Sequence, residues 1–271
     1  MDSTNETDDT RFDVRAADGT TIAVWVRGSG PALVMVHGSI ADHTTFDSFV
    51  AVLGDHFTTY SMDRRGFGAS GDTEEYAIER DFDDVAAVVD DVASRTGESV
   101  AVFGHSYGAN CAVGGAARTA NVRHLVLYEP SFGLQYPPGS IDDMDAALAN
   151  GENERVMVAI LTEFVGMTGA EIDAMRSNSV WPARLAAAHT IPRECRAEQD
   201  WVDTPGQFDA VTAPTLLLAG TDTIASIAEV TPRVAVSLAD ARIHVLAGHG
   251  HMAHKADPAM VAAVISEFVL G

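Results

Sequence analysis

The sequence predicts an α/β protein with a mostly parallel, eight-stranded sheet flanked by helices. Short apolar or alternating runs recur along the chain, and segments of helical periodicity separate several of the later runs. One long stretch, residues 131–206, has no convincing strand and several helix-like segments. A chain of 271 residues is long enough for one large α/β domain or for a domain that carries an insertion.

Eight runs are candidate strands because each is apolar or alternating over the length of a strand. In chain order they read FDVRAA, TIAVWV, ALVMV, TTYSM, VAVF, LVLY, TLLLA and IHVL. The first two are joined around Asp18-Gly19, which predicts an antiparallel hairpin. Helical segments at 80–94, 107–118 and 258–269 separate later runs, as is typical of a parallel sheet.

The stretch 131–206 is expected to form a helical lid. Its helix-like segments, separated by proline and glycine, read DMDAALAN, NERVMVAILTEFV, AEIDAMRS and WPARLAAAH. Because this stretch leaves one sheet and rejoins it, we expect an insertion between the sixth and seventh strands. The expected division is a core of residues 1–130 and 207–271 and a lid of residues 131–206; a separate helical domain is the alternative.

The charge balance is strongly acidic, with 39 acidic and 17 basic residues, a net charge of −22 and a single lysine, Lys255. Such a charge disfavours nucleic acid and anionic membranes as partners. It resembles that of proteins from a salt-rich cytoplasm, where molar salt shortens the screening length to about 3 Å. No apolar run approaches the length of a membrane span, and the first ten residues show no signal-peptide pattern. We therefore expect a halophilic, cytoplasmic monomer or homodimer.

One motif places a serine between two glycines at the junction of a buried strand and a helix. The motif reads GHSYG, from Gly104 to Gly108. A tight turn there would hold Ser106 in a strained conformation with its hydroxyl exposed at the end of the sheet. A side chain at either glycine would crowd that turn. The plain alternative is a serine in a turn without chemistry.

Four motifs together give the chain a resemblance to the α/β-hydrolase fold family, on its serine hydrolase branch. VMVHGS, DRRGFGAS, GHSYG and GHGHMAHKADP each follow a predicted strand, in the family's usual order. The resemblance implies an α/β-hydrolase fold with Ser106 as the nucleophile. A serine hydroxyl needs a neighbouring base to take its proton and a third group to orient that base.

The resemblance places the base on the loop after the last strand, where His249, His251 and His254 compete. The family's tail pattern aligns with GHMAHKADP so that His251 is the base. A metal site is the alternative, but the H-x-H-x-x-H spacing lacks a fourth ligand nearby. We expect no metal, and we expect His249 and His254 to be polar loop residues.

Two carboxylates compete to orient the base. The family's usual acid lies three residues after the glycine of TLLLAGTDT, where this chain has Thr223, and Asp222 comes one residue early. Glu129 directly follows the run LVLY, at a position where some members, including certain dehalogenases, place the acid. A glutamate there is costly without a partner, and a salt bridge at the lid hinge is its other reading. Asp222 and Glu129 both remain candidates.

The tetrahedral intermediate of acyl transfer needs preorganised donors for its oxyanion. The resemblance implies the backbone N–H groups of Ser39 and Tyr107. His37 is expected to brace the loop before Ser39 by hydrogen bonding. DRRGFGAS is expected to shape a turn, which makes Arg64 and Arg65 poor candidates for substrate binding.

The lid is expected to line the pocket for a small-molecule substrate. Its apolar and aromatic side chains are Phe132, Tyr136, Met157, Phe164, Met167, Trp181 and Trp201, and its arginines are not clustered as an anion clamp. The set favours an uncharged, moderately hydrophobic carboxylic ester or lactone, with no cofactor. The alternatives are a ligand-binding sensor with vestigial hydrolysis, or cofactor-free perhydrolase, haloperoxidase or carbon–carbon bond hydrolase chemistry on the same triad.

Overall fold

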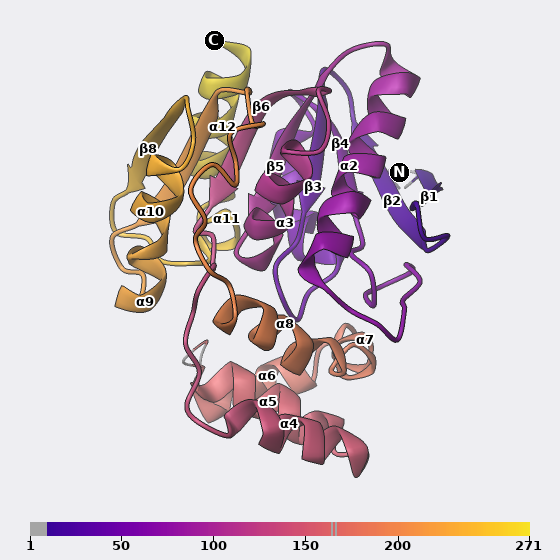
Figure 1. Ribbon diagram of the computed structural model, residues 1–271, viewed down its shortest axis with the longest axis vertical. Coiled ribbons are helices and arrows are strands. Elements are labelled where there is room, and N and C mark those ends of the chain that lie inside the picture. Colours follow the sequence, from indigo (N-terminus) through magenta and orange to yellow (C-terminus); the bar gives the residue numbers. More distant parts are fainter. Residues whose placement is uncertain (1–9, 164, 166) are drawn as a thin grey trace, which may run out of the picture.

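The computed structural model describes residues 10–163, 165 and 167–271 and shows one eight-stranded sheet (Figure 1). The strands are β1 Thr10–Arg15, β2 Thr21–Gly28, β3 Ala32–Val36, β4 Thr58–Met62, β5 Val100–His105, β6 Val122–Tyr128, β7 Thr215–Gly220 and β8 Ala241–Leu246. Their spatial order is β1-β2-β4-β3-β5-β6-β7-β8. The β1–β2 and β2–β4 pairs are antiparallel and all other pairs are parallel, so most carboxyl ends meet at one edge.

Helices cover both faces of the sheet. Outside the segment 131–206 they are η1 His43–Phe46, α1 Asp47–Leu53, α2 Ile78–Thr96, α3 Tyr107–Ala116, α9 Ala225–Ala228, α10 Val230–Val236, α11 Ala253–Ala256 and α12 Pro258–Leu270. Helix α2 forms because Phe82, Val85 and Val89 share one buried stripe at helical spacing. It ends at Gly97, which adopts the left-handed conformation with φ 76°.

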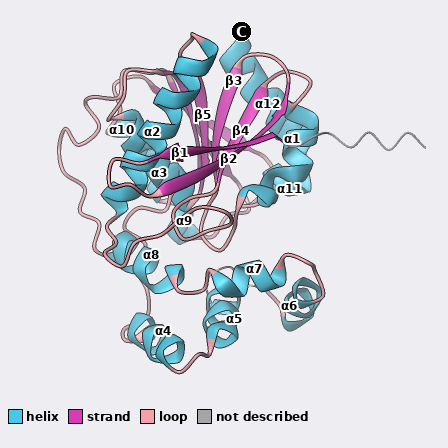
Figure 2. Ribbon diagram, turned by 90° about the vertical axis from the view of Figure 1, so that its right-hand side faces the viewer, coloured by secondary structure: helices cyan, strands magenta, loops and turns pink. Residues whose placement is uncertain are grey.

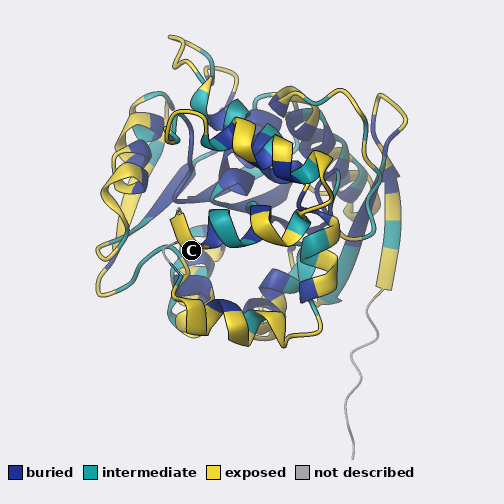
Figure 3. Ribbon diagram, turned by 90° about the horizontal axis from the view of Figure 1, so that it is seen from below, coloured by how far each residue is buried: buried dark blue, intermediate teal, exposed yellow. Residues whose placement is uncertain are grey.

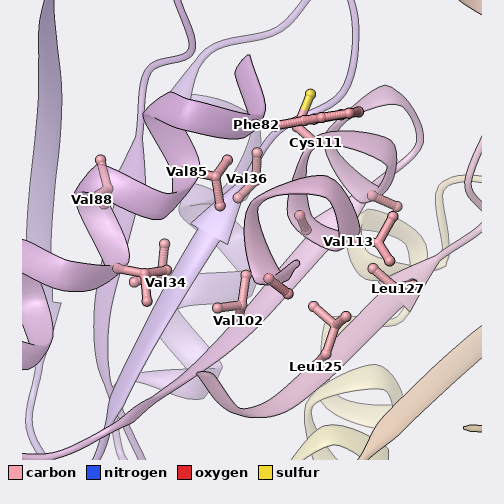
Figure 4. Packing of buried hydrophobic residues seen from close by; sticks show 14 of the residues in the cluster. Val34, Val36, Phe82, Val85, Val88, Val102, Cys111, Val113, Leu125 and Leu127 are labelled. Carbon is pink, nitrogen blue, oxygen red and sulfur yellow. The ribbon is translucent and has the colours of Figure 1, made fainter. Parts of the chain in front are cut away.

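Two apolar clusters bind these helices to the sheet. On one face, side chains of α2, α3 and α10 pack against β3, β5 and β6. Figure 4 shows Val85 of α2 beside Val36 of β3, and Phe82 of α2 beside Cys111 of α3. On the other face, α1 and α12 pack against the same strands and β7. Figure 3 shows the resulting pattern, with buried residues on the sheet and on the inward sides of the helices.

The segment 131–206, called the lid below, is helical in its described part and contains no strand there. Its helices are α4 Ser140–Ala149, α5 Asn153–Glu163, α6 Gly169–Arg176, α7 Trp181–Ala186 and α8 Thr190–Gln199. They share an apolar cluster of their own, which includes Met157, Trp181 and Ile191. Helix α8 lies close to the α/β body, and helices α4 and α5 lie farther from it (Figures 1 and 2).

The α/β class and the eight mostly parallel strands predicted from the sequence are confirmed. Helices α1, α8, α9, α10 and α11 were not among the predicted segments. Four of them have seven residues or fewer, too short to show a helical period, and the apolar residues of α8 are interrupted by charged ones. Phe164, one of the expected lining residues, lies outside the described residues. No helix in the described ranges is both long enough and apolar enough to span a membrane.

Candidate active site

Ser106 occupies the sharp turn between β5 and α3. Its φ is 56° and its ψ −126°, a conformation that costs a non-glycine residue free energy. The flanking glycines are required by space: a Cβ on Gly104 would lie 2.4 Å from the Gly108 carbonyl oxygen, and one on Gly108 would lie 2.3 Å from the Val36 carbonyl oxygen. The prediction that a side chain at either position would crowd the turn is confirmed.

His251 follows β8 and is held at the Nδ1 atom of its ring and along its backbone. Its Nδ1 donates a hydrogen bond to Glu129 Oε2 at 2.6 Å. The His105 Nε2–H donates to the His251 carbonyl at 2.8 Å, and the two ring centroids are 4.5 Å apart. The Tyr128 hydroxyl donates to the Gly250 carbonyl. Because His105 immediately precedes Ser106, these contacts bring the His251 loop to the turn that carries the serine.

Glu129 follows β6 and is 1% exposed, so its carboxylate needs partners. It has three: the His251 Nδ1–H on Oε2, and on Oε1 the Gly220 N–H at 2.7 Å and the Thr223 hydroxyl at 2.6 Å. The pairing of His105 with Tyr128 in adjacent parallel strands places Ser106 and Glu129 at neighbouring strand ends.

Asp222, the other candidate acid, lies at the surface. Its carboxylate accepts a hydrogen bond from the Thr221 hydroxyl at 3.0 Å, and its N–H donates to the His249 carbonyl at 2.9 Å. The physical reason is the length of the turn after β7, which brings Thr223 rather than Asp222 against the buried carboxylate. Of the two candidates, the structure brings Glu129 to His251.

The loop after β3 lies directly against the serine. A Cβ on Gly38 would be 3.0 Å from the Ser106 Cβ, which places the adjoining Ser39 at the same turn. Tyr107 begins α3, and the first N–H groups of a helix have no acceptor within the helix. His37 braces the loop as expected: its Nε2 accepts from the Arg64 N–H at 3.0 Å, and its Nδ1–H donates to the Gly38 carbonyl at 2.8 Å.

Backbone strain is concentrated at this site. In the described part of the chain, the non-glycine residues with positive φ are Ile40 at 54°, Ser106 at 56° and Glu129 at 46°. A positive φ is a genuine outlier for a β-branched residue such as Ile40. Strained residues of this kind persist where the surroundings hold them, and they cluster at functional sites. The three lie in the loop after β3, in the turn after β5 and at the end of β6.

The other two histidines of the last loop differ in burial: His249 is partly exposed and His254 is buried. The expectation that His254 is a polar loop residue is wrong: it lies in α11, is fully buried, and packs against Phe46 and Phe49. Burial lowers the pKa of His254 to about 3, which keeps the imidazole neutral. Over the described ranges, no group of three or more ligating side chains could hold a metal ion.

Helix α8 carries two buried carboxylates that the sequence reasoning missed. Glu194 and Glu198 are one turn apart and are 1% and 4% exposed. Glu194 Oε1 accepts from Arg64 Nη2 at 2.6 Å, and Glu198 accepts from the hydroxyls of Ser131 and Tyr136. The available signal was helical spacing in the stretch IPRECRAEQ, where the two glutamates share a face with Ile191 and Cys195.

The burial of Glu198 predicts a pH dependence of stability. Burial raises the pKa of Glu198 from its ordinary 4.5 to about 8, against the opposing hydrogen bonds of Ser131 and Tyr136. Between these two values the unfolded chain has lost the proton and the folded chain keeps it, so rising pH favours unfolding. The melting temperature should therefore fall from pH 5 to pH 8.5 at constant salt, and Glu198→Gln should make the decline shallower. Equal slopes for both proteins would contradict the assignment.

The sequence matches the model of the alpha/beta hydrolase family over residues 33–264, and the chain belongs to that family. It is similar to the crystal structure of an alpha/beta hydrolase from Sphaerobacter thermophilus, with 32% identity and a TM-score of 0.80 over 95% of this chain and 99% of that one. A 2-(acetamidomethylene)succinate hydrolase of Mesorhizobium japonicum is 25% identical over 92% of this chain and 91% of its own. An N-formylmaleamate deformylase of Pseudomonas putida is 29% identical over 81% and 84%. These relatives support a hydrolase activity.

Proposed function

We propose that the protein is a serine hydrolase in which Ser106 is the nucleophile, His251 the general base and Glu129 the acid that orients His251. The observation that carries the proposal is the 2.6 Å hydrogen bond between His251 Nδ1 and Glu129 Oε2. An ionised carboxylate can only accept, so Nδ1 carries the imidazole proton. The lone pair of Nε2 is then available to take the proton of Ser106.

The proposed reaction has two balanced halves. The Ser106 oxygen bonds to the substrate carbonyl carbon, its proton passes to His251 Nε2, and the carbonyl π pair moves to the oxygen. The N–H groups of Ser39 and Tyr107 stabilise the resulting oxyanion. Collapse breaks the bond to the leaving alcohol, which takes the proton from His251. Water then repeats the sequence on the acyl-enzyme, releasing the carboxylic acid and the serine hydroxyl.

The side chains in the described part of the lid favour an uncharged, moderately hydrophobic ester or lactone as the substrate, because they offer apolar surface and few unpaired positive charges. Four of the five lid arginines form salt bridges with acidic side chains; they are Arg155, Arg176, Arg193 and Arg196. Arg184 Nη1 donates to the Met175 sulfur at 2.8 Å. The apolar lid cluster also contacts Ile40, the residue after Ser39, which joins the apolar surface of the lid to the oxyanion loop.

A fluorophosphonate probe tests the nucleophile. We expect covalent labelling of Ser106, located by peptide mapping, and turnover of p-nitrophenyl acetate and butyrate. Ser106→Ala should abolish both, because the attacking oxygen is removed while the fold is kept. A wild-type protein that is not labelled, or a Ser106→Ala variant with wild-type rates, would rule out the mechanism.

A substrate panel tests the substrate class separately from the mechanism. It should contain short-chain esters and lactones, together with 2-(acetamidomethylene)succinate and N-formylmaleamate, the compounds in the names of two relatives. We expect the highest kcat/KM for an uncharged ester or lactone. Preferential turnover of the two carboxylates would overturn the uncharged class and leave the Ser106 mechanism standing.

A further inference from the structure

A buried arginine lies behind the loop that leads to Ser39. Arg64, the first arginine of DRRGFGAS, has no exposed surface. Its Nε donates to the His37 carbonyl at 2.9 Å, and its Nη2 to the Gly38 carbonyl at 3.3 Å. One planar guanidinium thus binds two successive carbonyl groups, a task that suits its fixed fork of donors.

These contacts fix the direction of the Ser39 N–H. In a planar trans peptide the C=O and N–H groups point in opposite directions, so anchoring the Gly38 carbonyl to Arg64 turns the next N–H away from the guanidinium. The Gly38 carbonyl also accepts from His37 Nδ1–H at 2.8 Å. Two donors on one carbonyl hold this peptide plane against the backbone strain at Ile40, whose φ is 54°.

The lid binds the same nitrogen of Arg64, Nη2, that donates to the Gly38 carbonyl. Glu194 of α8 accepts from Arg64 Nη2 at 2.6 Å, and Asp81 of α2 lies 3.4 Å from Nη1. The Arg64 guanidinium carbon is 4.8 Å from the centroid of the Tyr107 ring. The same arginine therefore contacts the lid, the loop before Ser39 and the residue after the nucleophile.

We propose that Arg64 is a positioning residue that directs the Ser39 N–H toward the Ser106 turn, and that Glu194 makes lid helix α8 part of the support of the oxyanion hole. The expected effect on catalysis rests on the proposed function. The anchoring of residues 37–39 by Arg64 does not depend on that function and can be tested without measuring turnover.

The chain offers a matched control one residue away. Arg65 is also buried and forms an ion pair with buried Asp84, at 2.7 Å and 2.8 Å. It donates further bonds to Asp18 and Thr73, on the loops before β2 and after β4. Arg65 is therefore similar in burial and charge pairing but has no contact with the carbonyls of His37 and Gly38.

The experiment compares Arg64→Lys with Arg65→Lys. Lysine keeps the charge but lacks the planar fork. Arg64→Lys should lower kcat for p-nitrophenyl butyrate by about 100-fold, the loss seen when one oxyanion donor is removed, with KM within about threefold. Arg65→Lys should lower the melting temperature while kcat stays within about threefold. Glu194→Gln should lower kcat by about tenfold, and Asp84→Asn should lower it by less than about threefold. If a lysine variant does not fold, the comparison of Glu194→Gln with Asp84→Asn tests the same proposal.

Amide hydrogen exchange gives a readout that does not depend on catalysis. Residues 37–40 should exchange at least tenfold faster in Arg64→Lys or Glu194→Gln than in the wild type, and at the wild-type rate in the Arg65 and Asp84 variants. Equal kcat and exchange in the two sets would overturn the inference. If the wild type is not labelled at Ser106, the proposed function fails, and the exchange rates alone still decide whether Arg64 anchors the loop.

Discussion

Replacing Glu129 with glutamine should lower kcat by about 10⁴-fold, the loss that follows when a triad acid is exchanged for its amide. The Gly220 N–H donates to Oε1 at 2.7 Å, so the new side chain must place its carbonyl oxygen there. Its NH₂ group then faces His251 Nδ1. The imidazole must accept at Nδ1 and carry its proton on Nε2, where it cannot take the proton of Ser106. KM should change by less than about threefold.

Asp222→Asn is the control for this substitution, because Asp222 is the other candidate for the acid that orients His251. Its carboxylate is exposed and contacts Thr221, so we expect kcat within about twofold of the wild type. Steady-state kinetics on p-nitrophenyl butyrate measures both variants. A large loss in Asp222→Asn together with a small loss in Glu129→Gln would reverse the assignment.

The sequence alone did not decide whether Glu129 or Asp222 orients His251. The strand–turn–helix context of GHSYG indicated Ser106, because a turn and its flanking strand are encoded together, and the resemblance of GHMAHKADP to the family's tail pattern indicated His251. The choice between Glu129 and Asp222 depends on how far the turn after β7 reaches, which is a property of the packed sheet. The clue was Thr223 at the usual acid position; its hydroxyl holds the Glu129 carboxylate at 2.6 Å.

The strands could be predicted from local sequence patterns, whereas the contacts between the lid helix α8 and the rest of the chain could not. Buried strands of a parallel sheet, such as β3 and β5, are continuous apolar runs, whereas the half-exposed strand β1 alternates apolar and polar residues; each pattern is local, so all eight strands could be predicted from the sequence. Helix α8 is different, since Glu194 and Glu198 interrupt its inward face with carboxylates. Their partners Arg64, Ser131 and Tyr136 are far along the chain, and no local pattern predicts that pairing.

Gly108→Ala should destabilise the fold by about 3 kcal/mol, at the upper end of the usual range for overpacking. A Cβ at position 108 would lie 2.3 Å from the Val36 carbonyl oxygen and 2.4 Å from that of His37. Both atoms are backbone, so no side chain can rotate away. Helix α3 must separate from β3, or the loop before Ser39 must shift. At about 2–4 °C per kcal/mol for a chain of this size, the melting temperature should fall by about 6–12 °C.

Gly169→Ala is the matched control, because a Cβ at the start of α6 would meet no atom within 4 Å. Alanine is the better helix former, so this variant should melt at or slightly above the wild-type temperature. Hydrolysis adds a second comparison: the displaced loop in Gly108→Ala should lower kcat, whereas Gly169→Ala should leave it unchanged. An unchanged melting temperature and kcat in Gly108→Ala would show that the second glycine of GHSYG is not required by space. In that case, the position of Ser106 beside the loop of Ser39 would not depend on the close approach of α3 to β3.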